Sequence, residues 1–216
     1  DAYTGARRLV ASDPLAVADL LLKLSHVESK LNRNGKARRW ATQARAALKG
    51  LESREAARQT ARSGAWYAHV LHFEGRTKES LRWAERAVAE AEAADDPEAL
   101  GDAYLVMGLA YGELGQEGAL PIMQRALEAF QRAGDLVGQA VILSNIGVVC
   151  QWEGRWDEAK SYYEQGRDAN VKIGNTMAAG RAHVKVAEIL IDRGEWAEAE
   201  ALLLELLREE VLPHFV

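Results

Sequence analysis

The sequence predicts an all-α protein in which about five helix pairs stack one after another. One observation is a set of five glycines with a regular spacing. They are Gly35, Gly75, Gly115, Gly154 and Gly194, at intervals of 40, 40, 39 and 40 residues. Between these breaks, apolar residues recur at the spacing that places them on one face of a helix, and the whole chain has only four prolines. Repetition at this length is typical of helical units that cannot bury their apolar faces alone.

A second set of signals marks the boundaries between pairs. Gly134 and Asp135 form one such signal. Gly174 and Asn175 repeat this signal 40 residues later. An Asp-Asp-Pro run at 95–97 lies 39 residues before Gly134 and Asp135. Here a glycine can end one helix in the left-handed conformation, and Asp or Asn can accept hydrogen bonds from the free amides of the next. The regularly spaced glycines fall midway, where the turn inside each pair is expected. The predicted pairs span residues 15–50, 54–94, 97–133, 136–173 and 176–209.

The array is predicted to be a single domain over residues 1–216 that belongs to a larger protein. The first residue is Asp1 rather than Met, and residues 1–11 have the pattern of the end of an amphipathic helix. We therefore expect residues 1–11 to be the second helix of a preceding, truncated pair. Residues 211–216 are expected to lead into a further pair.

The composition favours a globular protein and excludes several classes of function. Hydrophobic residues make up 48% of the chain, which is enough for a buried core. The 27 basic and 32 acidic residues give a formal charge of −5 and alternate along the chain, so neither nucleic acid nor a membrane surface is expected as a partner. Cys150 is the only cysteine, which rules out an internal disulfide or a cysteine-based zinc site and suits the cytoplasm. No cofactor is expected.

The fourth pair carries the most complete motif, LSNIGVVCQWEGRWDEAKSYYEQG. It places large, small and aromatic side chains in a fixed order, at Leu143, Ile146, Gly147, Cys150, Gly154, Ala159, Tyr163 and Gly166. This order resembles the signature of the tetratricopeptide repeat (TPR) family, and the third and fifth pairs repeat it. The resemblance implies a right-handed α-α superhelix. The period of about 40 exceeds the usual 34, and repeats of this length resemble those of bacterial nucleotide cyclases, signal-transduction ATPases and LuxR-type regulators.

Two further glycines are predicted to have a different role from those in the turns. Gly108 and Gly147 lie inside helices, where glycine costs roughly 1 kcal/mol relative to alanine, so each should mark a close contact between paired helices. In the first pair, alignment on Gly35 places Glu28 and Trp40 where the other pairs have small residues. The first pair is therefore the one that fits the motif least well.

The resemblance implies that the first helix of each pair lines a concave ligand groove. Counting from the matched glycines gives eight candidates, which are Leu105, Leu109, Val141, Asn145, Val148, Trp152, Arg181 and Lys185. Two alternatives stay open for the apolar ones: they form an exposed surface for an amphipathic helix or peptide, or neighbouring helices cover them. Asn145, Arg181 and Lys185 occupy places where family members clamp a peptide's C-terminal carboxylate. Because Leu105 and Leu109 replace the Lys and Asn of that clamp, a chaperone-tail ligand is disfavoured.

These features favour a non-catalytic interaction scaffold, the sensory or docking arm of a larger bacterial signalling protein. Its partner would be a protein or peptide segment, or a neighbouring domain of the same polypeptide. The alternative is self-association into a homodimer. An enzyme comes third, because His69 and His72, three residues apart on one helix face, supply only half of a metal site and no third ligand is evident.

Overall fold

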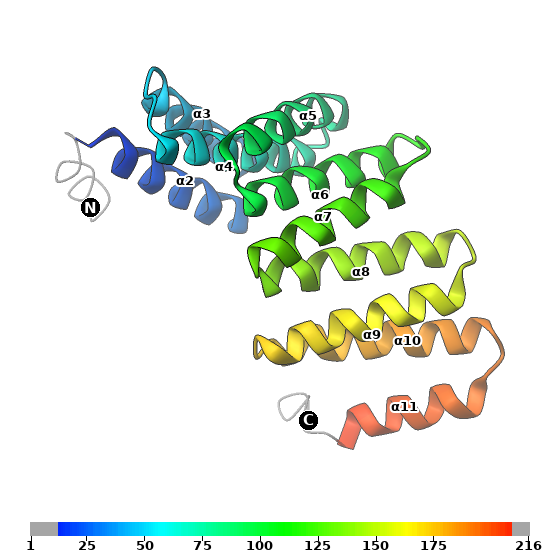
Figure 1. Ribbon diagram of the computed structural model, residues 1–216. Helices are drawn as coiled ribbons and strands as arrows, with labels where there is room; N and C mark the ends of the chain where they lie inside the picture. Colours follow the sequence, from blue (N-terminus) through cyan, green and yellow to red (C-terminus); the bar gives the residue numbers. More distant parts are fainter. Residues whose placement is uncertain (1–12, 209–216) are drawn as a thin grey trace. The chain divides into compact units, whose positions relative to one another are not determined.

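The structure, a computed structural model, describes residues 13–208 (Figure 1). Within this range every regular element is an α-helix, which confirms the all-α prediction. None of these helices combines the length and the apolar character that a membrane crossing requires. The chain divides into two compact units, residues 1–129 (unit 1) and residues 130–216 (unit 2). The helix expected at 1–11 and the continuation expected at 211–216 lie outside the described residues.

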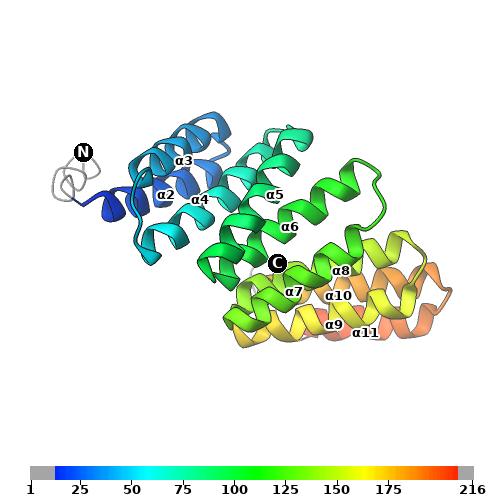
Figure 2. The same cartoon turned by 45° about the horizontal axis from the view of Figure 1, so that its top comes forward.

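Unit 1 is a series of helices joined by short turns. They are α2 (Pro14–Lys30), α3 (Asn34–Leu48), α4 (Arg54–Phe73), α5 (Thr77–Ala94), α6 (Pro97–Glu113) and most of α7 (Ala119–Ala133). Helix α4 packs against its pair partner α5 and also contacts α2 and α6, the first helices of the pairs before and after it. Figure 2 shows α2, α4 and α6 following one another in this order. Side chains from successive first helices can therefore meet on one face of the unit.

Unit 2 contains four further helices, coloured green to red in Figure 1. They are α8 (Leu136–Trp152), α9 (Trp156–Lys172), α10 (Thr176–Asp192) and α11 (Trp196–Arg208). Helix α9 packs against both α8 and α10, and α10 packs against α11. Each of the five predicted pair ranges thus holds two helices, with bounds close to those expected from the sequence.

Helix starts are fixed by side-chain caps at the predicted boundaries. Asp96 accepts a hydrogen bond from the amide of Ala99 at 3.2 Å, and Asp135 accepts two at 3.0 Å. Asn175 caps α10 by accepting from the amide of Ala178 at 3.2 Å. Replacing such a cap by alanine typically costs about 1 kcal/mol. The predicted caps at 96, 135 and 175 are therefore confirmed.

The turn inside most pairs is also where the glycine spacing places it. Gly75, Gly115, Gly154 and Gly194 have φ between 63° and 78° and lie between the two helices of their pairs. The prediction for Gly35 is wrong, because this residue lies in the first turn of α3. At the first pair the left-handed residue is Asn32, with φ of 57°. Asn is among the few non-glycine residues that adopt this conformation readily, so it replaces glycine here.

This correction moves the alignment of the first pair by three residues. Counted from Asn32, the two small positions are Ser25 and Ala37 rather than Glu28 and Trp40. Both are fully buried, and the Ser25 hydroxyl donates a hydrogen bond to the Ala37 carbonyl at 2.6 Å. In the second pair, Ser80 makes the same kind of bond between α4 and α5. The first pair therefore follows the common pattern once its turn is placed correctly.

The two glycines inside helices have the predicted packing role. A Cβ atom on Gly108 would lie 2.6 Å from Cγ of Met123, and one on Gly147 would lie 2.7 Å from Cε1 of Tyr163. Both distances are shorter than real contacts of this kind allow. Tyr163 is only 1% exposed, so its ring has little room to move aside. Glycine is required at these points because the partner side chain occupies the space of a methyl group.

Candidate ligand groove

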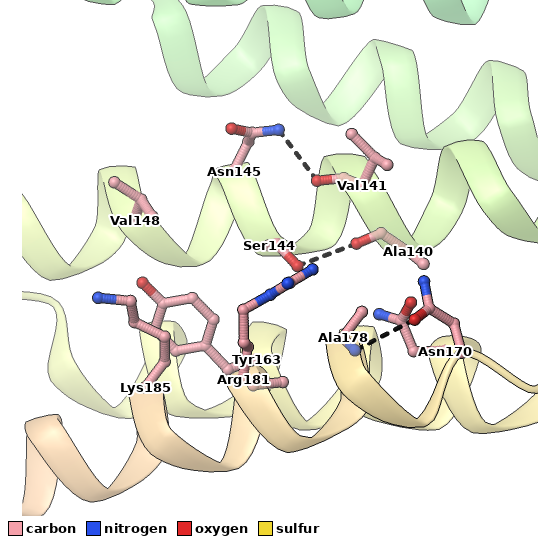
Figure 3. A pocket seen from close by; sticks show the side chains of 12 residues that line it. Ala140, Val141, Ser144, Asn145, Val148, Tyr163, Asn170, Ala178, Arg181 and Lys185 are labelled. Atoms are coloured by element: carbon pink, nitrogen blue, oxygen red, sulfur yellow. Dashed lines mark hydrogen bonds between the residues drawn. The ribbon is translucent and has the colours of Figure 1, made fainter. Parts of the chain in front are cut away.

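Unit 2 contains a groove of about 370 Å³ between α8 and α10, the first helices of two successive pairs (Figure 3). Helix α8 contributes Ala140, Val141, Ser144, Asn145 and Val148. The N-cap residue of α10 and the helix itself contribute Asn175, Ala178, Arg181, Ala182 and Lys185. Helix α9 contributes Tyr163 and Asn170. Most of these side chains are small or apolar, and none is acidic. The groove therefore combines an apolar surface with positive charge.

Helical spacing explains why these residues face the same space. Val141, Asn145 and Val148 are separated by four and three residues, so they lie along one face of α8. A different face of α8 carries Ile142 and Ile146, both fully buried. Because one face of α8 is held in the core, the orientation of the groove face is fixed.

Two polar side chains on α8 are anchored to their own helix. Ser144 Oγ donates to the carbonyl of Ala140 at 3.0 Å, and Asn145 Nδ2 donates to the carbonyl of Val141 at 3.0 Å (Figure 3). Asn145 Oδ1 has no hydrogen bond from any described residue. The amide is thus held in place by one of its ends, and its oxygen remains available as an acceptor.

The positive charge of the groove comes from α10. Lys185 Nζ lies 2.7 Å from Glu188 Oε2, in a pair whose side chains are 45% and 43% exposed. Arg181 is exposed and has no ion pair or hydrogen bond with the residues that the structure describes. In Figure 3 its side chain extends from α10 towards Ser144 on α8. Arg181 therefore supplies an unneutralised guanidinium with all five of its donors available.

Five of the eight predicted groove residues line this groove. They are Val141, Asn145, Val148, Arg181 and Lys185. Trp152, at the end of α8, is 79% exposed but is not among the lining residues. The part of these five residues and of Trp152 in ligand binding stays a prediction.

The other two candidates lie on α6 in unit 1. The side chain of Leu105 is only 5% exposed, so it offers little surface to a ligand. Residues 103–106 are all buried, and four successive residues make more than one turn, so α6 is covered on every side at this level. Leu109 is half-buried. Of the two alternatives for the apolar candidates, coverage by neighbours holds for Leu105 and exposure holds for Trp152.

Two residues of the groove come from a helix that was not expected to line it. Tyr163 and Asn170 belong to α9, a second helix, whereas the predicted groove used first helices only. Asn170 is 5% exposed and donates to the carbonyl of Gly166 at 2.8 Å. Asn170 follows Ala159, Tyr163 and Gly166 at helical spacing, so it lies on the face of α9 that meets the paired helix. This spacing is the sequence signal that could have identified Asn170.

The two histidines considered for a metal site form part of a ring stack in unit 1. The His69 ring lies 4.5 Å from the ring of Phe73 and 6.3 Å from that of His72, measured between centroids. Burial, with a smaller effect from His72, lowers the pKa of His69 to about 4. Between residues 13 and 208, no three or more His, Cys, Asp and Glu side chains are grouped so as to hold a metal ion. The arrangement is that of packed rings, among which burial keeps the His69 imidazole uncharged at neutral pH.

Comparison with known proteins supports the resemblance seen in the sequence. A family model described as tetratricopeptide repeat matches residues 107–170. No match is found among proteins of curated function. The matched range spans most of the third pair and most of the fourth, where the motif is most complete.

Solved structures extend the similarity to nearly the whole chain. BtubC (BKLC) from P. vanneervenii has a TM-score of 0.81 and 18% identity over 99% of this chain and 89% of its own length. A signal transduction ATPase with a TPR sensor, from Pyrococcus horikoshii, has a TM-score of 0.70 and 18% identity over 94% of this chain and 31% of its own. A Rap protein complexed with competence and sporulation factor has a TM-score of 0.72 and 15% identity over 95% and 58%. The predicted resemblance to tetratricopeptide repeat proteins is therefore confirmed, and the fold is a TPR-like solenoid of helix pairs.

Proposed function

We propose that this chain is a non-catalytic interaction module that binds a protein or peptide segment in the groove between α8 and α10. The TPR-like fold suggests a protein interaction scaffold. The observation that supports this groove as the site is its combination of apolar lining with the unpaired Arg181. Recognition sites commonly join an apolar surface to a few fixed polar groups in this way.

Each lining group has a definite role in such a complex. Val141, which is 45% exposed, and Val148 provide apolar area, and its burial is worth roughly 25 cal/mol per Å². Asn145 Oδ1 can accept a hydrogen bond from a main-chain amide of the bound segment. Arg181 can bind a carboxylate through two parallel hydrogen bonds. The preferred ligand is thus a segment with an apolar side chain next to an acidic group.

The wider role proposed is that of a sensory or docking arm in a larger signalling protein. Among the similar structures, one is named for its TPR sensor and another is a complex with competence and sporulation factor. This chain spans only 31% and 58% of those two proteins. A neighbouring domain of the same polypeptide is a candidate occupant on the same grounds.

Selection from a random peptide library, followed by affinity measurement, tests this proposal. Peptides captured by the unmodified chain should bind at least about tenfold more weakly to Arg181→Glu and to Val141→Glu, because each change places a carboxylate in the groove. Arg125→Glu is the matched control, since Arg125 is exposed on α7 and lines no groove. Equal binding by all three variants, with unchanged circular dichroism, would contradict the groove assignment.

Self-association is a second candidate, and α11 supports it. This last described helix exposes 44% of Leu204 and 68% of Leu207. Paired copies would bury these side chains. Sedimentation over a concentration series should then show a dimer that Leu207→Lys weakens, whereas a monomer at every concentration would remove this candidate.

A further inference from the structure

A second pocket, in unit 1, lies among α3, α4 and α5. Its volume is about 460 Å³, and it is lined by Arg45, Ala46, Leu48, Lys49, Gly50, Leu51, Thr60 and Arg86. Every charged side chain of this lining is a cation. In a chain of net charge −5, this is a local excess of positive charge that the whole-chain composition does not reveal.

The charges around this pocket do not cancel. Arg45 donates to both carboxylate oxygens of Glu90, at 2.8 and 3.0 Å, and Arg86 Nε donates to Oε1 of the same group at 2.8 Å. One carboxylate therefore neutralises only one of two guanidiniums. Lys49 adds a further cation that has no hydrogen bond or ion pair with the described residues. The group of three cations and Glu90 carries two uncompensated positive charges.

The guanidiniums are held in place before any ligand arrives. Their Cζ atoms lie 5.0 Å (Arg45) and 5.1 Å (Arg86) from the centre of the Trp83 ring. Arg45 also donates to the carbonyl of Thr60 at 2.8 Å, and its side chain is 13% exposed. Gly64 leaves the space for this pair, since a Cβ there would lie 2.8 Å from Arg45 Nη1. A ligand would therefore not need to order these side chains on binding.

Arg86 and Lys49 retain the donors that an anion requires. Within the described chain, Arg86 donates a side-chain hydrogen bond through Nε only. The side chain is 59% exposed, so its two terminal nitrogens remain available. The end of α3 at Leu48 contributes a partial negative charge, equivalent to roughly half a unit at most, which the two free cations outweigh. A phosphate monoester carries a charge of about −1.5 to −2 and three acceptor oxygens. Its charge and geometry match this cation set.

We propose that the pocket among α3, α4 and α5 binds the phosphate group of a phosphate monoester, with Arg86 and Lys49 as its direct ligands. Arg45, already bonded to Glu90, positions Arg86 through that shared carboxylate. Leu48 and Leu51 offer an apolar wall to the remainder of the ligand. This site is independent of the groove in unit 2.

The equivalent place in unit 2 shows that the fold alone does not create this charge. Counted from the turns, Arg167 occupies the position of Arg45, and it lines a pocket among α9, α10 and α11. That pocket also contains three carboxylates, those of Glu164, Glu198 and Glu205. Arg167 is bonded to Asp168 at 2.8 Å and lies 3.0 Å from Nε2 of His183. The cationic lining is therefore not repeated at this equivalent place in unit 2.

Titration of the chain with inorganic phosphate and with O-phosphoserine, followed by NMR at constant ionic strength, tests the proposal. Saturable shifts of amides near residues 49–51 and 86 are expected with both probes, and sodium chloride at the same ionic strength should not produce them. Tighter binding of O-phosphoserine than of phosphate supports a phosphate monoester as the ligand, whereas saturable binding of inorganic phosphate alone would contradict it.

The double variant Lys49→Gln/Arg86→Gln should raise the dissociation constant about tenfold or more, because both direct ligands are lost. The matched control is Lys78→Gln/Arg82→Gln, which removes the same charges from exposed positions of α5 outside the pocket. Arg181→Glu should also leave phosphate binding unchanged, which separates this site from the groove. Absence of saturable binding, or equal affinity in the double variant and its control, overturns the proposal.

Discussion

The faces formed by successive first helices differ between the two units at equivalent positions. Counted back from Gly75 and Gly154, Trp66 on α4 takes the place of Asn145 on α8, and His69 takes the place of Val148. In unit 1 the Trp66 ring stacks on His26 of α2, with centroids 3.6 Å apart and planes 14° apart, and its Nε1 donates to Ser25 Oγ at 2.7 Å. In unit 2 the same positions hold smaller side chains, and a groove remains.

This difference separates what the fold provides from what the side chains decide. Both units place successive first helices next to each other, so each has the backbone arrangement for a groove. Large rings fill that space in unit 1 and join α2 to α4. Asn and Val leave it open in unit 2. Whether a repeat array of this kind binds a ligand at a given place therefore depends on a few positions per helix.

The largest expected effect comes from removing the central ring of unit 1. Trp66→Ala deletes the stack with His26 and the hydrogen bond to Ser25, so the free energy of unfolding should fall by about 3 kcal/mol or more. Trp152→Ala in unit 2 is the control, because a side chain that is 79% exposed should contribute within about 0.5 kcal/mol. Urea denaturation of both variants measures this, and equal losses would contradict the comparison.

The ring stack should also make unit 1 sensitive to acid. His69 stays neutral in the folded chain down to a pKa of about 4, and burial also lowers the pKa of His26, whereas unfolded histidines take up protons below about 6.5. The unfolded state then binds more protons, so stability is full above pH 6.5 and falls as the pH drops towards 4, by up to about 3 kcal/mol for His69.

Denaturation at pH 7.5 and pH 5, with and without His69→Gln, measures this effect. The variant cannot take up the proton, so it should lose less stability between the two pH values. Identical pH dependence in both proteins would mean that the His69 ring is not held in the uncharged state by its surroundings.

A smaller pair of effects distinguishes the two kinds of glycine. Gly147→Ala should cost about 1–3 kcal/mol, because the new methyl group would meet the buried Tyr163 ring. Gly35→Ala should instead stabilise by about 0.5–1 kcal/mol, since Gly35 is helical and nothing lies within 4 Å of an added Cβ. Thermal unfolding measures the stability change of both variants. Destabilisation by Gly35→Ala would indicate that Gly35 is a turn residue after all.

Much of the fold could be predicted from the sequence because its signals are local. Gly75, Gly154 and the cap Asp135 each act on the backbone next to them, so their spacing gives helix bounds directly. The first pair shows the limit of such signals. Asn32 and Gly35 both suit a turn and lie three residues apart, and the burial of Ser25 and Ala37, which chooses between them, is a tertiary property.

The candidate site was less accessible to sequence reasoning. The family resemblance, with positions counted from the matched glycines, pointed to the α8 and α10 faces and hence to Asn145 and Arg181. Such counting does not report how deeply a neighbouring helix covers a face, which is why exposure and coverage both stayed open for Leu105. Side chains that reach the groove from a second helix, such as Asn170, depend on contacts between helices that a single-helix pattern does not contain.

The most direct test of the central claim is to close the groove of unit 2 in the way that unit 1 is closed. Asn145→Trp places an indole where α4 has Trp66, on a half-buried position that faces the groove. If the groove is the binding site, peptides selected on the unmodified chain should bind this variant at least about tenfold more weakly, with an unchanged unfolding midpoint. Unchanged peptide affinity in a correctly folded Asn145→Trp variant would show that the ligand binds elsewhere.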